Sequence, residues 1–268
     1  MSWITAKRRR PAAGYAVVLL GLILVGAVYA TITGSGNSAA ATDPTVSQTQ
    51  IAQGRQIFQQ TCATCHGLEA QGTPVAPSLI GVGAAAVYFQ VSTGRMPLRE
   101  PGAEADRKPP QLTPAQTRAV AAYIQALGGG PPIPSAAQVS TSGADLALGE
   151  ELFTANCAQC HNFDGAGGAL TYGKYAPPLT ASTPTQIYTA MLTGPEAMPV
   201  FNDTTITPQE KRDIIAYVTA TRAQGNPGGF SLGRIGPVTE GLVAFLGLLF
   251  FMVLAAMWIT AKHRKTAE

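Results

Sequence analysis

The chain has 268 residues, a length that fits one large domain or two small ones. Charged residues make up only 12% of it, while glycine (29) and proline (20) are abundant, which excludes a solvated disordered chain and a coiled coil. The net charge of +3 comes from the two ends, since the stretch between them holds more acidic than basic residues. Nucleic acid is therefore not an expected partner.

The first expected element is a helix over residues 12–32, a run without any charged side chain. About 20 apolar residues span a bilayer, and the basic segment at residues 1–11 predicts that this end is cytoplasmic. A secretory signal is the rival interpretation, with Ala39-Ala40-Ala41 as its cleavage site. A signal has a shorter apolar stretch, of about 7–15 residues, which favours a retained anchor. Either interpretation exports the middle of the chain.

The middle of the chain is a repeat. The segment Gly54–His66 (GRQIFQQTCATCH) matches Gly149–His161 (GEELFTANCAQCH), and Leu112-Thr113-Pro114 matches Ile206-Thr207-Pro208. Thr93-Gly94 likewise matches Thr193-Gly194. Gly/Pro-rich and Ser-rich stretches mark the linkers. The predicted boundaries are a linker at 33–49, domain 1 at 50–128, a linker at 129–144, domain 2 at 145–223 and a linker at 224–237.

Each copy is expected to be helical. Short helices over residues 53–61 and 148–156 lead into the cysteines. Thr113 and Thr207 each precede a proline, the pattern of an N-cap followed by proline at the first helical position. The helices that they begin are expected to end near Leu127 and Arg222. The loops between show no strand alternation, so the fold class is mainly α.

A second uncharged run, within an expected helix over residues 238–260, closes the chain. A soluble core helix is the other interpretation, but such helices rarely stay apolar on every face. Trp258 and the basic tail at residues 261–268 place this end in the cytoplasm as well. The two repeated domains, flanked by two spans of the cell membrane, then lie on the extracytoplasmic side.

All four cysteines lie in two Cys-x-x-Cys-His motifs, whose members are Cys62, Cys65 and His66, and Cys157, Cys160 and His161. This is the attachment sequence of c-type haem. Two thiols add across the two vinyl groups of one porphyrin, and the next residue presents its imidazole to the iron. The sequence therefore predicts two covalently bound haem c groups.

Three other interpretations of the motifs are weaker. A zinc ribbon places its second cysteine pair about 15–20 residues after the first, whereas residues 66–156 intervene here. A thioredoxin-like pair needs a βαβ context, which is absent from the pattern. Disulfides within each pair are possible outside the cytoplasm, but they explain neither the histidines nor the repeat.

The second axial ligand of each iron follows by elimination. The third histidine, His263, lies beyond the second span, which leaves methionine. Met96 and Met198 each follow a Thr-Gly pair and precede a proline, so they are the expected ligands; Met191 is expected to pack in the core. Iron with both axial sites filled transfers electrons and binds no substrate.

Other residues near the haems give weaker signals. Arg95, Tyr88 and Tyr175 are candidates to bind haem propionates, and a solvated loop side chain is as good an interpretation of each. Pro77 and Pro177 are expected to support the loop that hydrogen-bonds the axial histidine. Each domain is small, so haem is expected to supply much of its core, and the apo-protein is expected to fold poorly.

These motifs resemble class I cytochrome c twice over. They are Gly54, Phe58, Cys62, Cys65 and His66 with Met96, and Gly149, Phe153, Cys157, Cys160 and His161 with Met198. The order of span, two haem domains and span resembles the dihaem cytochrome cc subunit of the actinobacterial quinol–cytochrome c reductase, the cytochrome bcc complex. That resemblance implies a respiratory translocase with a cytochrome b subunit and a Rieske iron–sulfur subunit. Electrons then pass from the Rieske centre to a terminal cytochrome c oxidase, and this chain has no catalytic site of its own.

Two rival functions remain. One is a dihaem electron-transfer subunit of a periplasmic dehydrogenase or of another oxidase type, against which the C-terminal span argues. The other is a dihaem peroxidase, which needs one displaceable ligand and usually a further histidine that this sequence lacks.

Overall fold

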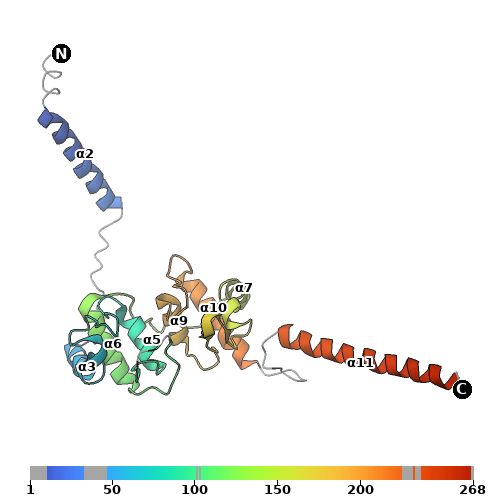
Figure 1. Ribbon diagram of the computed structural model, residues 1–268. Coiled ribbons are helices and arrows are strands. Elements are labelled where there is room, and N and C mark those ends of the chain that lie inside the picture. The colour runs from blue at the N-terminus through green and yellow to red at the C-terminus, as the bar shows by residue number, and fades with distance from the viewer. Residues whose placement is uncertain are drawn as a thin grey trace, which may run out of the picture. The chain divides into compact units, whose positions relative to one another are not determined.

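The computed structural model describes residues 11–32, 47–100, 102, 104–224, 232 and 237–266, without the side chains at 11–13, 28–32 and 262–266 (Figure 1). The basic segment before residue 11, most of the two outer linkers and the side chain of His263 lie outside the described residues. The chain divides into one unit at Met1–Ser47 and another at Gln48–Glu268, and each is described by itself.

Helix α2, Pro11–Ile32, occupies the first unit. Its described side chains, at Gly14–Ala27, form an apolar stretch and are exposed. Helix α11, Pro237–Thr266, belongs to the other unit and contains the apolar stretch Val238–Ala261, which is long enough to cross a bilayer and is unburied. Among the described residues, this is the one helix of that length and composition. Within the part of the chain that the structure describes, neither apolar run packs into a core.

The first lobe, residues 48–128, is built from four helices: α3 (Gln48–Thr61), α4 (Ala63–His66), α5 (Gly83–Ser92) and α6 (Pro114–Gly128). Helices α3 and α5 both pack on α6. Phe58, Val120 and Ile124 lie at the centre of its core and are almost fully buried. The lobe thus has an apolar core of its own beside its Cys-x-x-Cys-His turn.

The second lobe, residues 146–223, repeats this arrangement. Its elements in chain order are α7 (Leu146–Asn156), α8 (Ala158–His161), β1 (Gly168–Ala169), η1 (Thr171–Gly173), β2 (Tyr175–Ala176), α9 (Pro184–Thr193) and α10 (Pro208–Ala223). Helices α7 and α9 pack on α10, with Phe153, Tyr188 and Ile215 buried between them. The expectation of no strand is wrong here, because β1 and β2 pair antiparallel; two-residue strands are too short to show alternation.

A glycine allows the first and last helices of each lobe to cross closely. A Cβ atom added to Gly54 of α3 would lie 2.0 Å from the carbonyl oxygen of Ala119 in α6. A Cβ atom added to Gly149 of α7 would lie 2.1 Å from the carbonyl oxygen of Asp213 in α10. No real side chain tolerates such distances, so the glycine shared by the two copies sets the crossing that carries each cysteine motif.

Threonine caps begin three of the helices. The predicted caps Thr113 and Thr207 each accept a hydrogen bond from a backbone N–H of the first turn, and each takes part in a capping box. Thr183 does the same for α9, ahead of Pro184 and Gln186. The sequence carries the same Thr-Pro signal at Thr183, although α9 was not among the predicted helices.

The two lobes meet through equivalent helices. Helix α5 packs on α9. Helix α5 ends at Ser92, just before Thr93-Gly94, and α9 ends at Thr193, the first residue of the matching pair. Gln186 of α9 is buried and donates from Nε2 to the carbonyl oxygen of Ser92, at 3.2 Å, and to its Oγ, at 3.1 Å. The contact therefore joins the segments that lead into the two candidate methionine ligands.

Candidate functional site

The first Cys-x-x-Cys-His turn is held between α3 and a loop. The N–H of His66 donates to the carbonyl oxygen of Cys62 at 3.0 Å, so the thiols and the imidazole share one helical turn. His66 Nδ1 lies 2.8 Å from the carbonyl oxygen of Pro77, which can only accept. The proton is therefore on Nδ1, and Nε2 keeps the lone pair that a metal needs.

The second turn has the same construction. The N–H of His161 donates to the carbonyl oxygen of Cys157 at 2.9 Å, and His161 Nδ1 lies 3.0 Å from the carbonyl oxygen of Pro177. Burial lowers the pKa of His161, partly offset by the hydrogen bond to Pro177, which favours the neutral imidazole that binds iron. The expectation for Pro77 and Pro177 is confirmed, and the accepting carbonyls belong to the prolines themselves.

The thiols do not suit the alternative chemistries. All four cysteines are free. Burial is the larger cause, and the charge of the neighbouring cysteine the smaller one, that raises the pKa of Cys62 to about 11 and the pKa of Cys157 to about 12. Zinc binding and disulfide exchange both use the thiolate. In the described part of the chain, no group of three or more His, Cys, Asp or Glu side chains is placed to hold a metal ion. Burial therefore keeps Cys62 and Cys157 as neutral thiols.

The candidate methionine ligands follow tight turns. Gly94 has a positive φ of 69°, and a Cβ atom there would lie 1.9 Å from the carbonyl oxygen of Lys108. Met96 comes two residues later and packs, partly buried, on the core of the first lobe. Gly194 also has a left-handed backbone conformation, with a positive φ of 57°. Met198 is partly buried and packs on the core of the second lobe. The two Thr-Gly pairs thus give the two methionines the same setting.

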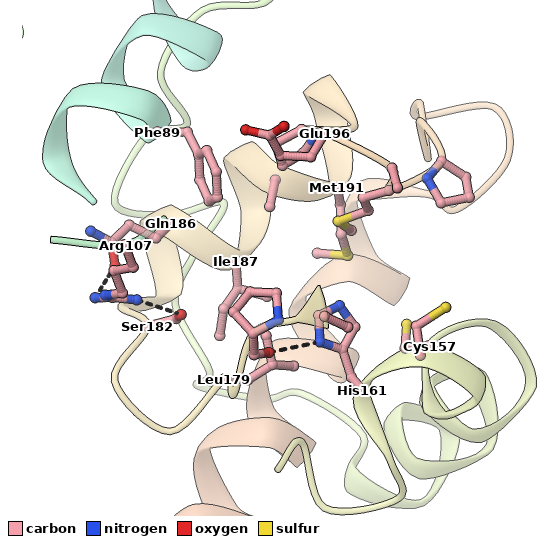
Figure 2. A pocket seen from close by; sticks show the side chains of 18 of the residues that line it. Phe89, Arg107, Cys157, His161, Leu179, Ser182, Gln186, Ile187, Met191 and Glu196 are labelled. Atoms are coloured by element: carbon pink, nitrogen blue, oxygen red, sulfur yellow. Dashed lines mark hydrogen bonds between the residues drawn. The ribbon is translucent and has the colours of Figure 1, made fainter. Parts of the chain in front are cut away.

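A cavity in the second lobe gathers the predicted residues (Figure 2). Cys157, Cys160, His161 and Met198 all line it, and Phe153, Leu179, Ile187, Phe201, Ile214 and Val218 supply apolar walls. Two thiols, a neutral imidazole, a thioether and an apolar lining are the donor set of a covalently bound haem. The residues present therefore fit the group that the motif implies.

Met191 lines the same cavity and is also a core residue, with 2% of its surface exposed. It lies in α9, two residues before the Thr-Gly pair, where the first lobe has Val91. Val91 is buried in the core of its lobe and has no atom that ligates iron. The repeat therefore pairs Met198 with Met96 and assigns Met191 to a packing position.

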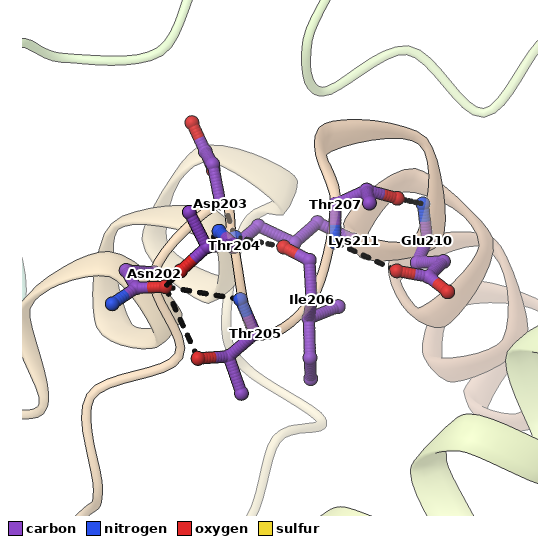
Figure 3. A network of polar contacts seen from close by, with 8 residues as sticks. All are labelled: Asn202, Asp203, Thr204, Thr205, Ile206, Thr207, Glu210 and Lys211. Carbon is purple, nitrogen blue, oxygen red and sulfur yellow. Dashed lines mark hydrogen bonds and ion pairs between the residues drawn. The ribbon is translucent and has the colours of Figure 1, made fainter. Parts of the chain in front are cut away.

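One buried cation holds the loop after Met198 (Figure 3). Lys211 of α10 is fully buried, and its Nζ donates to Asp203 Oδ1 at 2.8 Å and to the carbonyl oxygen of Ile206 at 2.5 Å. Asn202 Oδ1 accepts from the backbone N–H groups of Thr204 and Thr205, each at 3.0 Å. The Asn-x-Thr-Thr turn is visible in the sequence, whereas nothing there marks a lysine on an amphipathic helix as buried.

The three candidate propionate ligands differ in position. Arg95 is only 6% exposed and lines the cavity of the second lobe, so its interpretation as a solvated side chain is wrong. Tyr175 lines the same cavity and is half exposed. Tyr88 lies under Arg118, whose guanidinium carbon is 5.5 Å from the ring centre. Arg107, which the sequence did not single out, also lines the cavity of the second lobe.

Both lobes match known families. A model of the cytochrome c family matches residues 51–128, and a model described as cytochrome c oxidase, cbb3-type, subunit III matches residues 144–218. The cbb3-type cytochrome c oxidase subunit FixPc of Rhizobium leguminosarum bv. viciae is 33% identical over 136 residues, which cover 47% of this chain and 44% of that protein.

Two relatives match along nearly their whole length. The cytochrome bc1 complex cytochrome c subunit of Corynebacterium diphtheriae is 44% identical over 271 residues, covering 96% of each chain. The subunit with the same name in Mycobacterium bovis is 45% identical over 260 residues, covering 95% of this chain and 92% of the relative. Together with the repeated haem-attachment geometry, these matches show that the chain belongs to the family of cytochrome c subunits of the cytochrome bc1 complex.

Proposed function

We propose that this chain carries two covalently bound haem c groups and relays electrons within a quinol–cytochrome c reductase. Cys62 and Cys65 hold the first haem with His66 and Met96 as axial ligands; Cys157 and Cys160 hold the second with His161 and Met198. Haem supplies one-electron redox chemistry. The observation that carries the proposal is the shared turn in each lobe, where a proline carbonyl fixes the imidazole beside two thiols.

The residues of each lobe suit electron transfer rather than catalysis. Pro77 and Pro177 orient the imidazoles, and Met96 and Met198 fill the opposite axial positions. Two filled positions leave none for oxygen or a peroxide, which argues against a peroxidase. Apolar side chains around the second cavity exclude water and support a raised reduction potential. The chain is thus the electron-transfer subunit of a translocase and has no catalytic site of its own.

The partners follow from the family. We propose that the chain sits in the cell membrane with a cytochrome b subunit and a Rieske iron–sulfur subunit, takes electrons from the Rieske centre and passes them to a terminal cytochrome c oxidase. Spans at residues 12–32 and 238–260 hold both termini in the cytoplasm and the domains at 50–128 and 145–223 outside. The basic segments at the two ends support this orientation.

A subunit of another oxidase type is the second candidate. The match of residues 144–218 to a cbb3-type subunit favours it. That similarity covers about half of this chain in the Rhizobium relative, whereas the bc1-complex relatives match about 95% of it, so the reductase is preferred.

Counting the haems tests the proposal. The purified chain is expected to retain two haems per polypeptide after acid–acetone extraction, measured by mass spectrometry and by the pyridine haemochrome. A chain with Cys157→Ala and Cys160→Ala is expected to retain one. If the unmodified chain holds a single haem, or loses haem on extraction, covalent attachment at both motifs is wrong.

A further inference from the structure

The first lobe has a longer connection after its methionine than the second. Residues 97–112 separate Met96 from Thr113, whereas residues 199–206 separate Met198 from Thr207. Residues 104–108 of the longer connection, here named the strap, lie against the second lobe. Glu104, Ala105, Asp106 and Arg107 of the strap all line the cavity that contains His161. The site of the second lobe is therefore walled in part by the first.

Hydrogen bonds fix the strap to both sides of this cavity. Arg107 donates from Nη1 to Ser182 Oγ at 3.1 Å, from Nη2 to the carbonyl oxygen of Ala181 at 2.7 Å, and from Nη2 to Gln186 Oε1 at 3.5 Å. The N–H of Ala105 donates to Glu196 Oε1 at 3.3 Å, and that of Tyr175 donates to Glu104 Oε2 at 3.3 Å. The strap is thus held by several hydrogen bonds to the second lobe, while the N–H of Lys108 donates to the carbonyl oxygen of Thr93 in its own lobe at 3.2 Å.

A second cation of the first lobe is buried at the same cavity. Arg95 is 6% exposed and lines the cavity, with its guanidinium carbon 4.9 Å from the centre of the Phe89 ring. Its Nη1 atom is buried and has no hydrogen-bond partner among the described residues. A buried donor without an acceptor carries a desolvation cost, so this atom marks the place of an acceptor that the described residues do not supply.

The charges around Arg95 point the same way. Arg95 and Arg107 both line the cavity, and so do the carboxylate residues Glu104, Asp106 and Glu196. Two of the nearby carboxylates, those of Glu104 and Glu196, already accept backbone hydrogen bonds. An anion bound between two guanidinium groups forms charge-assisted hydrogen bonds with both of them.

Haem has the matching anions. Its two propionates lie on the opposite edge of the ring from the vinyl groups that the cysteines bind. In Figure 2, Cys157 and Arg107 lie on opposite sides of His161, as that layout requires. We propose that Arg95 and Arg107 of the first lobe bind the propionates of the haem in the second lobe, so that the first lobe completes the second haem site. This inference rests on the proposed attachment of haem at both motifs.

A consequence is a higher reduction potential for the second haem. Positive charge near the propionates disfavours the ferric form, which is the more positive of the two. Removing one such charge is expected to shift the one-electron equilibrium constant of that haem by about tenfold towards the oxidised form. The haem of the first lobe should keep its potential.

The test is a potentiometric titration of the full chain in its complex, with Arg95→Gln, Arg107→Gln and the double substitution. Met198→His and Met96→His, made separately, identify which wave belongs to which haem. Arg118→Gln is the matched control, because it removes the same charge from an exposed position of the first lobe. We expect each Gln variant to lower the second potential, the double variant to lower it further, and Arg95→Lys to restore most of the loss.

A change in the reduction potential of the first haem alone would overturn the proposal, because Arg95 would then bind the haem of its own lobe. Unchanged potentials of both haems in all Gln variants would overturn it as well. Arg107 is exposed, so Arg107→Gln is expected to fold, and its second potential decides the matter if Arg95→Gln loses haem. Haem content separates this outcome from failure of the proposed function: an unmodified chain without two covalent haems contradicts the proposed function itself.

Discussion

At the scale of single residues, the second lobe places two thioethers beside one imidazole. Met191 and Met198 both line the cavity of His161, and sequence spacing from the cysteine motif alone favours Met191. The structural repeat favours Met198, because Val91 occupies the position of Met191 in the first lobe. With Met96 and Met198 as ligands, the methionine that follows the Thr-Gly pair and precedes a proline has the same role in both lobes.

Substitution separates the two methionines. Met198→His is expected to keep the haem attached but to lower its reduction potential, because an imidazole replaces a thioether. Met96→His should do the same for the first haem. Met191→Leu, of similar volume, should change neither the potential nor the weak absorption band of the methionine–iron bond. Loss of that band in the Met191→Leu chain would show that Met191 is the ligand.

Lys211 holds the loop after Met198 and does not line the cavity of His161. Lys211→Met removes the donor to Asp203 and to the carbonyl oxygen of Ile206, and is expected to cost about 2 kcal/mol of unfolding free energy. Asp203→Ala should cost at least as much, because it leaves the fully buried ammonium of Lys211 without its carboxylate partner. Thermal unfolding of the haem-loaded chain measures both. A much smaller loss in Asp203→Ala than in Lys211→Met would show that the ion pair does not hold the loop.

At the scale of elements, each haem turn depends on one helix crossing. Gly149→Ala places a Cβ atom 2.1 Å from the carbonyl oxygen of Asp213, so α7 must move away from α10. Overpacking of this kind costs about 1–3 kcal/mol, and we expect a lower unfolding temperature with partial loss of the second haem. Glu150→Ala, at an exposed position of the same helix, is the control and should change stability by less than about 0.5 kcal/mol. A Gly149→Ala chain as stable as that control would refute the crossing.

Some of these helices and turns could be predicted from the sequence, and others could not. The Cys-x-x-Cys-His turns and the Thr-Pro caps of α6 and α10 are local signals, and those elements were predicted. Helix α5 begins at Gly83 without a side-chain cap, so no local signal marks it. The burial of Lys211, and the reach of Arg107 to Ser182, depend on residues far apart in the chain. Contacts of that kind come from packing, which one sequence does not reveal.

At the scale of the whole molecule, the two lobes form one continuous electron-transfer body. Equivalent helices α5 and α9 pack together, Gln186 bonds to Ser92 across the contact, and the strap closes the second site. The two covalent haems proposed for this chain would remove the need for a diffusing carrier between membrane enzymes. Permanent neighbours do not need long-range steering, which agrees with a body of mixed charge.

The most direct test of the account is quinol-driven oxygen uptake in membranes that carry His161→Ala. If the two haems act in series with the first lobe as the entry point, oxygen uptake stops while quinol still reduces the first haem. A spectrum of the purified variant shows whether the first lobe is intact, since an intact but unreduced first haem would mean that electrons enter at the second lobe. Oxygen uptake through this route at the full rate would contradict the account, because the second haem would then not be part of the path.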